Sequence, residues 1–269
     1  MSNTATRILV GVIGIPLFLF LIYKGGIYFL VLSIILSGIA LWEFYTMFKK
    51  ENLHPLMGFP ILLSIVIIIS NYFYPGSAIY LLLLSAVLIC SLEVFRKVKH
   101  NPYNSLISIF GLVYICVPFV CLNRIILYEQ FNYIIYIFIL IWTCDTMAFF
   151  GGKFLGKHKL SAISPKKTWE GSITGLVFTL LASYLFYYFS DGKLTFIDAI
   201  VLGFVIGVFS QIGDLFESLF KRKLNVKDSS HIIPGHGGVL DRFDSLIFVA
   251  PLIFLYLNMT KIIVSFQIP

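Results

Sequence analysis

Charged residues are scarce in this sequence. Asp, Glu, Lys and Arg together make up 12% of its 269 residues, whereas about a quarter of an ordinary soluble domain is charged. Hydrophobic residues make up 59% of the chain. Because so few charges are available to cover a solvent-exposed surface, the composition argues against a water-soluble fold.

Cysteine motifs are also missing. The four cysteines lie inside apolar stretches, and none of them forms a CxxC pair or stands beside histidines in a metal-binding pattern. We therefore interpret these cysteines as packing residues, and they give no information about the redox compartment. They are Cys90, Cys116, Cys121 and Cys144.

Long apolar stretches recur along almost the whole chain. About 20 apolar residues can cross a bilayer as a helix, because a helix satisfies its own backbone polar groups. The sequence therefore predicts an all-α, polytopic transmembrane helical bundle of about nine spans: 8–23, 27–47, 57–74, 78–95, 105–123, 132–150, 170–190, 196–218 and 244–265. We expect the first span to be retained, because no small-residue cleavage pattern follows it.

The basic residues predict the orientation of these spans. If the N-terminus is cytoplasmic, 16 of the 20 Lys and Arg residues fall on the cytoplasmic side, where cationic residues are preferred. Nine spans then place the C-terminus outside and two long loops, 151–169 and 219–243, in the cytoplasm. The net charge of +7 would lie mainly on one face, which would also attract anionic lipid.

Span eight carries polar residues on one face of its last turns. Asp214, Glu217, Ser218 and Lys221 are spaced i, i+3, i+4 and i+7, which places them along one side of a helix. A carboxylate inside a span costs about 2.5 to 3.5 kcal/mol on insertion scales, so it is a functional candidate. The alternative is a structural ion pair between Glu217 and Lys221, which leaves Asp214 unpaired along its own helix.

Glycines and histidines follow in the second long loop. Gly235, Gly237 and Gly238 permit backbone conformations in which successive N–H groups point at an anion such as a phosphate. His231 and His236 are not accompanied by cysteine, and nearby carboxylates favour a hard cation over zinc.

Carboxylates at the ends of spans eight and nine suit Mg²⁺, which prefers oxygen ligands and substrate phosphates. Asp214 and Asp241 are the first candidates as ligands. A second cation could also bind, because Glu217 and Asp244 supply further carboxylate oxygens. The further candidate ligands are Glu217, Asp244 and Asp145, although Asp145 could equally pair with a loop lysine. Two other carboxylates, Glu43 and Glu93, lie near cytoplasmic helix ends, where we expect them to reach water.

The first long loop contains a second phosphate-binding candidate. Ser164 and Pro165 predict a helix start, with Ser164 as the N-cap, beside Lys166 and Lys167. Free N–H groups and lysines at such a point suit a polyanion such as a nucleoside triphosphate. There is no Walker motif, so this segment alone is not specific for a nucleotide.

The run SLFKRKLNVKDSSHIIPGHGGVLDRFD, residues 218–244, resembles the signature of CDP-diacylglycerol synthases, also called phosphatidate cytidylyltransferases. The run SPKKTWEGS, residues 164–172, and Asp145 with Thr146 are similar to this family as well. The resemblance covers the C-terminal half. The first 130 residues match only in their hydrophobic pattern.

The resemblance implies an enzyme of phospholipid biosynthesis that uses CTP and phosphatidate. It implies a multi-pass protein of the cell inner (plasma) membrane, with a cytoplasmic active site, Mg²⁺ and a homodimer. We expect membrane lipids but no nucleic acid among its partners. Residues 1–130 would be N-terminal transmembrane helices for dimerisation or a lipid-facing scaffold, and residues 131–269 a C-terminal transmembrane catalytic region.

The resemblance also implies roles for single residues. The predicted catalytic residues are Asp214, Asp241, Lys221, Arg222 and Arg242. The predicted substrate contacts are Ser164, Lys166, Lys167, Thr168, Glu170, Ser218, Lys227, Asp228, His236, Gly237 and Gly238.

Two other functions use a similar distribution of polar residues. A CTP-dependent polyprenol-type lipid kinase shares part of the pattern, although the whole HGGVLDRFD run is not expected there. An ion-coupled transporter also places carboxylates in its helices. In this chain the carboxylates cluster toward the predicted cytoplasmic ends, and no inverted repeat relates the two halves.

Overall fold

The structure is a computed structural model that describes residues 3–49, 53–96, 101–127 and 132–266, with side chains from residue 11 to residue 260 of these ranges. This part of the chain is helical apart from its loops, and its only extended pairings are two isolated bridges. The all-α prediction is therefore confirmed for the described residues. Part of the predicted topology rests on basic residues outside the described side chains: Arg7, Lys50, Lys97, Lys99 and Lys261.

Each predicted span coincides with a helix or with a continuous helical segment. The elements are α1 (Asn3–Lys24), α2 (Gly26–Phe48), α3 (Gly58–Phe73), α4 (Ser77–Phe95), α5 (Pro102–Gly111), the π-helical turn η2 (Leu112–Cys116), α6 (Val117–Ile125), α7 (Tyr133–Leu155), α8 (Trp169–Tyr188), α9 (Phe196–Lys223) and α10 (Leu240–Phe266). Predicted span five corresponds to α5, η2 and α6 together.

Seven helical segments among the described residues are long and apolar enough to cross a membrane. They are α2, α4, the segment Pro102–Ile125, α7, α8, α9 and α10. Helix α3, with 16 residues, and Gly11–Lys24, the part of α1 whose side chains the structure describes, are shorter. The chain is thus a membrane protein by its helices, while the count of nine crossings and the orientation stay predictions.

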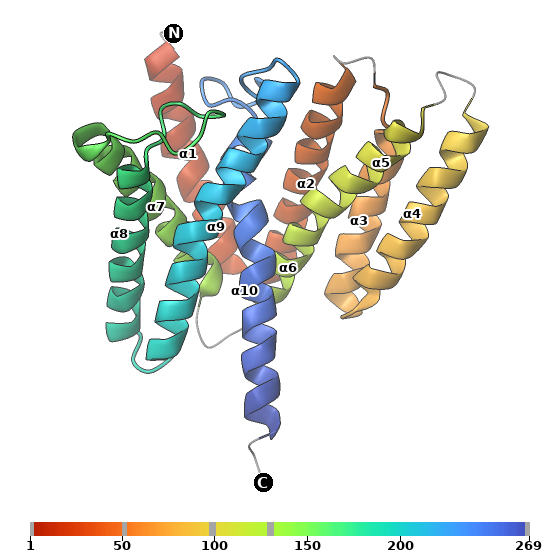
Figure 1. Cartoon of the computed structure of the whole chain (residues 1–269). Helices are drawn as coiled ribbons and strands as arrows, with labels where there is room; N and C mark the ends of the chain where they lie inside the picture. Colours follow the sequence, from red (N-terminus) through yellow and green to blue (C-terminus); the bar gives the residue numbers. More distant parts are fainter. Residues whose placement is uncertain (1–2, 50–52, 97–100, 128–131, 267–269) are drawn as a thin grey trace. The chain divides into compact units, whose positions relative to one another are not determined.

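The helices divide into two compact units (Figure 1). The first unit consists of Met1–Leu127 and Lys221–Phe243, and the second of Tyr128–Phe220 and Asp244–Pro269. Helices α9 and α10 each contribute residues to both units. The loop between α9 and α10 is therefore grouped with the N-terminal helices, whereas the sequence-based division at residue 130 placed it with the catalytic region.

In the first unit, neighbouring helices along the chain pack on one another, α1 on α2, α2 on α3 and α3 on α4 (Figure 1). Helix α5 approaches α2 closely at Gly111, where an added Cβ would lie 2.6 Å from the ring of Tyr45. The Tyr45 hydroxyl donates a hydrogen bond to the carbonyl oxygen of Ser108 at 2.7 Å. This contact anchors α5 against the half of α2 that leads to its C-terminus.

In the second unit, α7 and α8 lie side by side along their length (Figure 1). Small residues permit this close packing: a Cβ at Gly151 would lie 2.5 Å from Thr174, and one at Gly171 would lie 2.6 Å from the carbonyl oxygen of Ala148. Gly151 and Gly152 therefore belong to α7, and not to the first loop as predicted. The loop begins only at residue 156.

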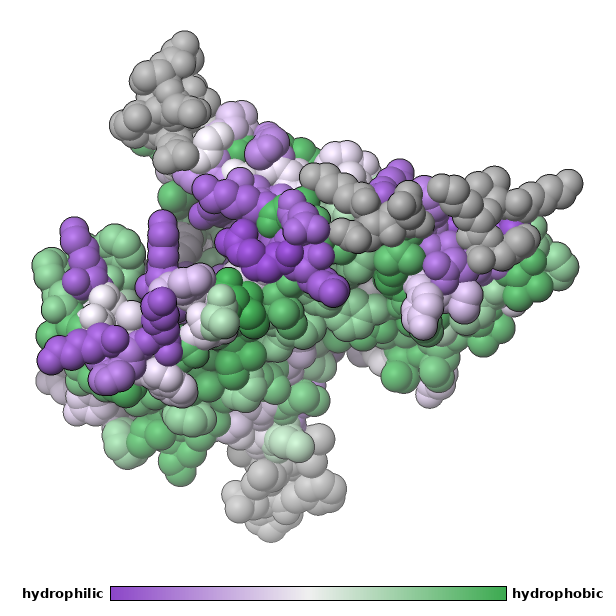
Figure 2. All heavy atoms as spheres, turned by 45° about the horizontal axis from the view of Figure 1, so that its top comes forward, coloured by the Kyte–Doolittle hydropathy of each residue, from purple (hydrophilic) through white to green (hydrophobic). Residues whose placement is uncertain are grey.

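The second loop is also shorter than predicted. Helix α9 continues to Lys223 and α10 begins at Leu240, so the loop consists of residues 224–239. In Figure 2, hydrophilic residues gather at the loop ends of helices, while apolar residues cover the helix sides. Large apolar side chains such as Leu83 on α4, 63% exposed, suit lipid rather than water as the surrounding medium.

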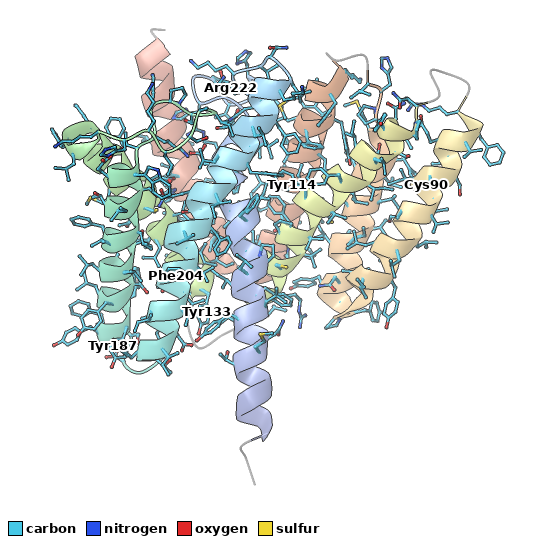
Figure 3. The ribbon with its side chains drawn as sticks, viewed as in Figure 1. Cys90, Tyr114, Tyr133, Tyr187, Phe204 and Arg222 are labelled. Atoms are coloured by element: carbon cyan, nitrogen blue, oxygen red, sulfur yellow. The ribbon has the colours of Figure 1, made fainter. Side chains whose placement is uncertain are left out.

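Three of the four cysteines are packing residues, as predicted. Cys116, Cys121 and Cys144 are buried. The prediction is wrong for Cys90, which is exposed on α4 (Figure 3).

Candidate active site

The polar stripe of α9 meets the first loop inside the second unit. Lys167 Nζ lies 2.5 Å from Asp214 Oδ2, although 47 residues separate the two in the sequence. Ser218 Oγ donates a longer hydrogen bond of 3.4 Å to Asp214 Oδ1. The Asp214 side chain is 34% exposed, whereas Glu217 on the same stripe is buried. The predicted lysine and the predicted aspartate are thus brought together.

The start of α10 also lies against this stretch of α9 in the second unit. A Cβ at Gly213 would lie 2.6 Å from the carbonyl oxygen of Asp244. The rings of Phe216 and Phe248 are 5.2 Å apart. The absence of a side chain at Gly213 therefore lets the two helices approach next to Asp214.

The helix after the first loop begins four residues later than predicted. Thr168, and not Ser164, is the N-cap of α8, because its hydroxyl oxygen accepts a hydrogen bond from Gly171 N at 3.2 Å. Ser164 begins a turn in which Lys167 N donates to Ser164 O at 3.0 Å. A Ser-Pro pair is typical of turns as well as of helix starts, and here the turn positions Lys167.

Glu170 organises the rest of the first loop. Its carboxylate accepts hydrogen bonds from Lys157 N at 3.1 Å and from His158 N at 3.2 Å, and its Oε1 lies 2.6 Å from His158 Nδ1. Glu170, a predicted substrate contact, thus connects the first turn of α8 to the residues that follow α7. Lys166 is exposed.

Asp241 is the centre of a hydrogen-bond network in the first unit. Its Oδ1 lies 2.7 Å from Lys221 Nζ. Its Oδ2 accepts hydrogen bonds from Ser229 N at 2.9 Å, Ser229 Oγ at 2.9 Å and Gly238 N at 2.8 Å. The side chain is only 6% exposed. Asp241 therefore ties the end of α9 and two separate parts of the second loop, at Ser229 and at Gly238, to the first turn of α10.

Glu43 of α2 enters the same network, contrary to the expectation that it reaches water. The residue is 0% exposed. Its Oε1 accepts hydrogen bonds from Ser230 Oγ at 2.5 Å and Val239 N at 2.9 Å. Its Oε2 accepts hydrogen bonds from Leu240 N at 2.7 Å and Ser229 Oγ at 3.2 Å.

The one sequence signal that Glu43 belongs to this hydrogen-bond network was its position inside an apolar span, because intramembrane carboxylates are functional candidates. Glu93 is also buried rather than solvated. Its carboxylate accepts a hydrogen bond from Asn104 Nδ2 at 2.9 Å and forms an ion pair with Arg96 at 3.2 Å. Both carboxylates near helix ends were therefore misjudged, because side chains from distant segments replace water around them.

The loop glycines are required by packing inside the first unit. Gly237 has φ +85°, a conformation that L side chains rarely adopt. A Cβ at Gly238 would lie 2.6 Å from Glu43 Oε1 and against Ser229 Oγ. These contacts explain the two glycines without a phosphate, so their predicted contact with substrate stays a prediction.

Most of the other residues predicted to act in or beside the second loop are exposed at the surface of the protein. Arg242 is exposed, and its Nε donates a hydrogen bond to the carbonyl oxygen of His236 at 2.9 Å. The Nδ1 atom of His236 is buried and has no hydrogen-bond partner among the described residues. Arg222 is exposed at the loop end of α9 (Figure 3), and Lys227 and Asp228 are exposed in the loop itself.

The cation site expected from the sequence stays a prediction. Asp214 and Asp244 belong to the second unit and Asp241 to the first. Asp145 is exposed on α7. Within the described part of the chain, no cluster of three or more His, Cys, Asp or Glu side chains is arranged to hold a metal ion.

Comparison with known proteins identifies relatives over almost the whole chain. The model of the cytidylyltransferase family matches residues 5–260. A phosphatidate cytidylyltransferase of Staphylococcus aureus (strain COL) is 36% identical over 256 residues, which are 92% of this chain and 96% of the relative. A phosphatidate cytidylyltransferase of Bacillus subtilis (strain 168) is 35% identical over 267 residues, 96% of this chain and 98% of the relative.

Proposed function

Since the chain belongs to the cytidylyltransferase family, we propose that it transfers the cytidylyl group of CTP to phosphatidate, which gives CDP-diacylglycerol and pyrophosphate. The observation that carries this proposal is the extent of the similarity. Relatives named as phosphatidate cytidylyltransferases match over nearly their full length, so the match includes both polar loops. The chain is accordingly a nucleotidyltransferase of phospholipid biosynthesis.

The proposed reaction needs positioning more than it needs an acid or a base. An oxygen of the phosphatidate phosphate attacks the α-phosphorus of CTP in line, and the bond from this phosphorus to the oxygen bridging toward the β-phosphorus breaks. Pyrophosphate leaves with the electron pair of that bond. Because the attacking phosphate is already an anion near neutral pH, no strong general base is required, and His236 is proposed as a phosphate or ribose contact.

Cationic side chains would offset the charge that develops on pyrophosphate. The proposed residues are Lys166, Lys167, Lys221, Arg222 and Arg242. Two of them are supported by their contacts, because Lys167 lies 2.5 Å from Asp214 and Lys221 lies 2.7 Å from Asp241. An ammonium group held by a carboxylate is already oriented before substrate arrives, which lowers the cost of organising the site.

The carboxylates of Asp214 and Asp241 fit Mg²⁺ by their donor chemistry. Each of them already attracts a cationic group, Lys167 on Asp214 and Lys221 on Asp241. Asp214 fits more readily, because within the described part of the chain its Oδ1 accepts only the 3.4 Å hydrogen bond from Ser218. When bound, the ion would neutralise charge on the CTP phosphates. A second cation, with oxygens from Glu217, Asp244 or Asp145, belongs to the same proposal.

The proposed setting is the inner (plasma) membrane, with the reacting groups at the cytoplasmic face and a homodimer as the working form. Seven apolar helical segments support the membrane location. The basic residues of the two long loops support the cytoplasmic face, because cationic loops prefer that side. Phosphatidate would then enter laterally from the cytoplasmic leaflet, with its acyl chains in lipid.

A two-label assay tests the proposed reaction. Purified protein is incubated with phosphatidate, Mg²⁺ and CTP that carries label on either its α- or its γ-phosphate, and the lipid and pyrophosphate are analysed separately. Label from the α position should appear in a CDP-lipid, and label from the γ position should appear in pyrophosphate.

Two outcomes would contradict this proposal. Transfer of γ-label to lipid, with release of CDP, would identify a CTP-dependent lipid kinase instead. Absence of both lipid products, with protein that remains folded in detergent or lipid, would exclude both enzymatic functions. A matched incubation without Mg²⁺ tests the proposed ion, since turnover should require it.

A further inference from the structure

Glu43 connects an N-terminal helix to the second loop without facing solvent. Each of its two carboxylate oxygens accepts two hydrogen bonds. Of the four donors, two are the backbone N–H groups of Val239 and Leu240 and two are serine hydroxyls. Val239 and Leu240 stand at the N-terminus of α10, where backbone N–H groups lack helical partners and a negative charge is favoured. Glu43 therefore caps α10 from another helix, 197 residues away in sequence.

One serine connects Glu43 to Asp241. Ser229 Oγ lies 3.2 Å from Glu43 Oε2 and 2.9 Å from Asp241 Oδ2, and Ser229 N also donates to Asp241 Oδ2 at 2.9 Å. Gly238 contributes its N–H to Asp241 and leaves the space that Glu43 and Ser229 fill. The place and rotamer of the Asp241 carboxylate thus depend on groups that Glu43 holds.

We propose that Glu43 is a positioning residue for the proposed cytidylyl transfer, acting through Ser229 and the first turn of α10 to orient Asp241. This inference rests on the proposed function, because it assigns Glu43 a role in that reaction without contact to substrate. A buried carboxylate is retained in a protein core only when hydrogen bonds replace its water, and here the four donors belong to the loop or to the start of α10.

Glu93 provides a matched comparison within the same unit. It is also a buried carboxylate at the end of an apolar helix, and each of its oxygens accepts a hydrogen bond from a side chain. Its side-chain partners Asn104 and Arg96 connect α4 to α5, and among the described residues none of its hydrogen-bond partners belongs to the second loop. A purely structural function of buried carboxylates would therefore make the two residues equivalent in their effect on turnover.

Steady-state kinetics of three variants test the proposal. In Glu43→Gln the amide NH₂ replaces one oxygen and meets donors such as Leu240 N–H, so the end of the loop must shift. A misplacement of this kind should lower kcat by about 100-fold with the KM for CTP little changed. Ser229→Ala, which removes only the connecting hydroxyl, should lower kcat by about 10-fold. Glu93→Gln should retain the wild-type kcat.

Hydrogen exchange provides a readout independent of turnover. In Glu43→Gln the amides of Val239 and Leu240 should exchange faster, while those of α4 and α5 stay protected. In Glu93→Gln the amides of α4 and α5 should exchange faster, while those of Val239 and Leu240 stay protected. These measurements remain informative if the wild-type protein makes no CDP-lipid, so failure of the proposed function is distinguishable from failure of the positioning role.

Two results would overturn the inference. The first is an unchanged kcat in both Glu43→Gln and Ser229→Ala with protein that is folded by its thermal transition. The second is an equal loss of kcat in Glu43→Gln and Glu93→Gln, because that would show a general loss of stability. If Glu43→Gln does not fold, Ser229→Ala alone decides, and a wild-type kcat in that variant rejects the proposal.

Discussion

A methyl group added at Gly238 would occupy space that is already filled by two polar side chains. The Cβ of alanine would lie 2.6 and 2.7 Å from the Glu43 carboxylate oxygens and still closer to Ser229 Oγ. Gly238 has no positive φ, so alanine is compatible with its backbone and the effect must come from these contacts. Either the carboxylate or the serine has to move.

The expected cost follows from the groups that would be displaced. Overpacking of this kind costs about 1 to 3 kcal/mol. A hydrogen bond to a charged group is worth about 1.5 to 3 kcal/mol, and Ser229 Oγ contacts two carboxylates. If the misplacement of Asp241 raises the activation free energy of the reaction by about 2.7 kcal/mol, turnover should fall about 100-fold.

The assay compares Gly238→Ala with Gly58→Ala. Gly58 lies in the same unit at the start of α3, and a Cβ there would meet nothing within 4 Å. Both variants are purified in detergent, their thermal transitions are recorded, and CDP-lipid formation is measured below both transitions. Gly58→Ala should match the wild type. Equal turnover of the two variants would refute the reasoning, since it would show that the loop accommodates the methyl group without loss of function.

Three other substitutions have defined expectations. Asp214→Asn and Asp241→Asn should each reduce kcat by orders of magnitude while the protein stays folded, and near-normal turnover in either variant would remove that residue from the proposed metal ligands. Lys167→Met should lower kcat/KM more than Lys166→Met, because only Lys167 contacts Asp214; the reverse order would contradict the assigned contact. Thr168→Ala should lower the stability of the fold by about 1 kcal/mol through loss of the α8 N-cap, with Thr168→Ser largely unaffected, as judged from thermal transitions in detergent.

Local sequence features predicted most of the helices and the identity of the polar segments. Runs of apolar residues specify a transmembrane helix through their length alone, and each predicted span coincides with a helical segment. The helix ends were less predictable. The Ser164-Pro165 pair is compatible with a turn and with a helix start, and the Thr168 cap decided between them through its hydrogen bond to Gly171 N.

Contacts between distant segments were beyond the sequence patterns. Gly151 and Gly152 were assigned to the loop 151–169, whereas they lie in α7 where α8 approaches too closely for a side chain. Glu43 was expected to reach water because of its place near a helix end. Its true surroundings come from residues 229–240, and no periodicity in the sequence connects these segments.

The sequence by itself therefore determined the apolar helices, the family and the set of polar residues available for chemistry, because each of these depends on residue type and on spacing over a few turns. Tertiary structure decided which of these residues meet. The pairing of Lys167 with Asp214, of Lys221 with Asp241 and of Glu43 with the start of α10 depends on how helices and loops pack. A hydrogen bond forms only when packing brings donor and acceptor within about 3 Å, a condition that residue order alone does not impose.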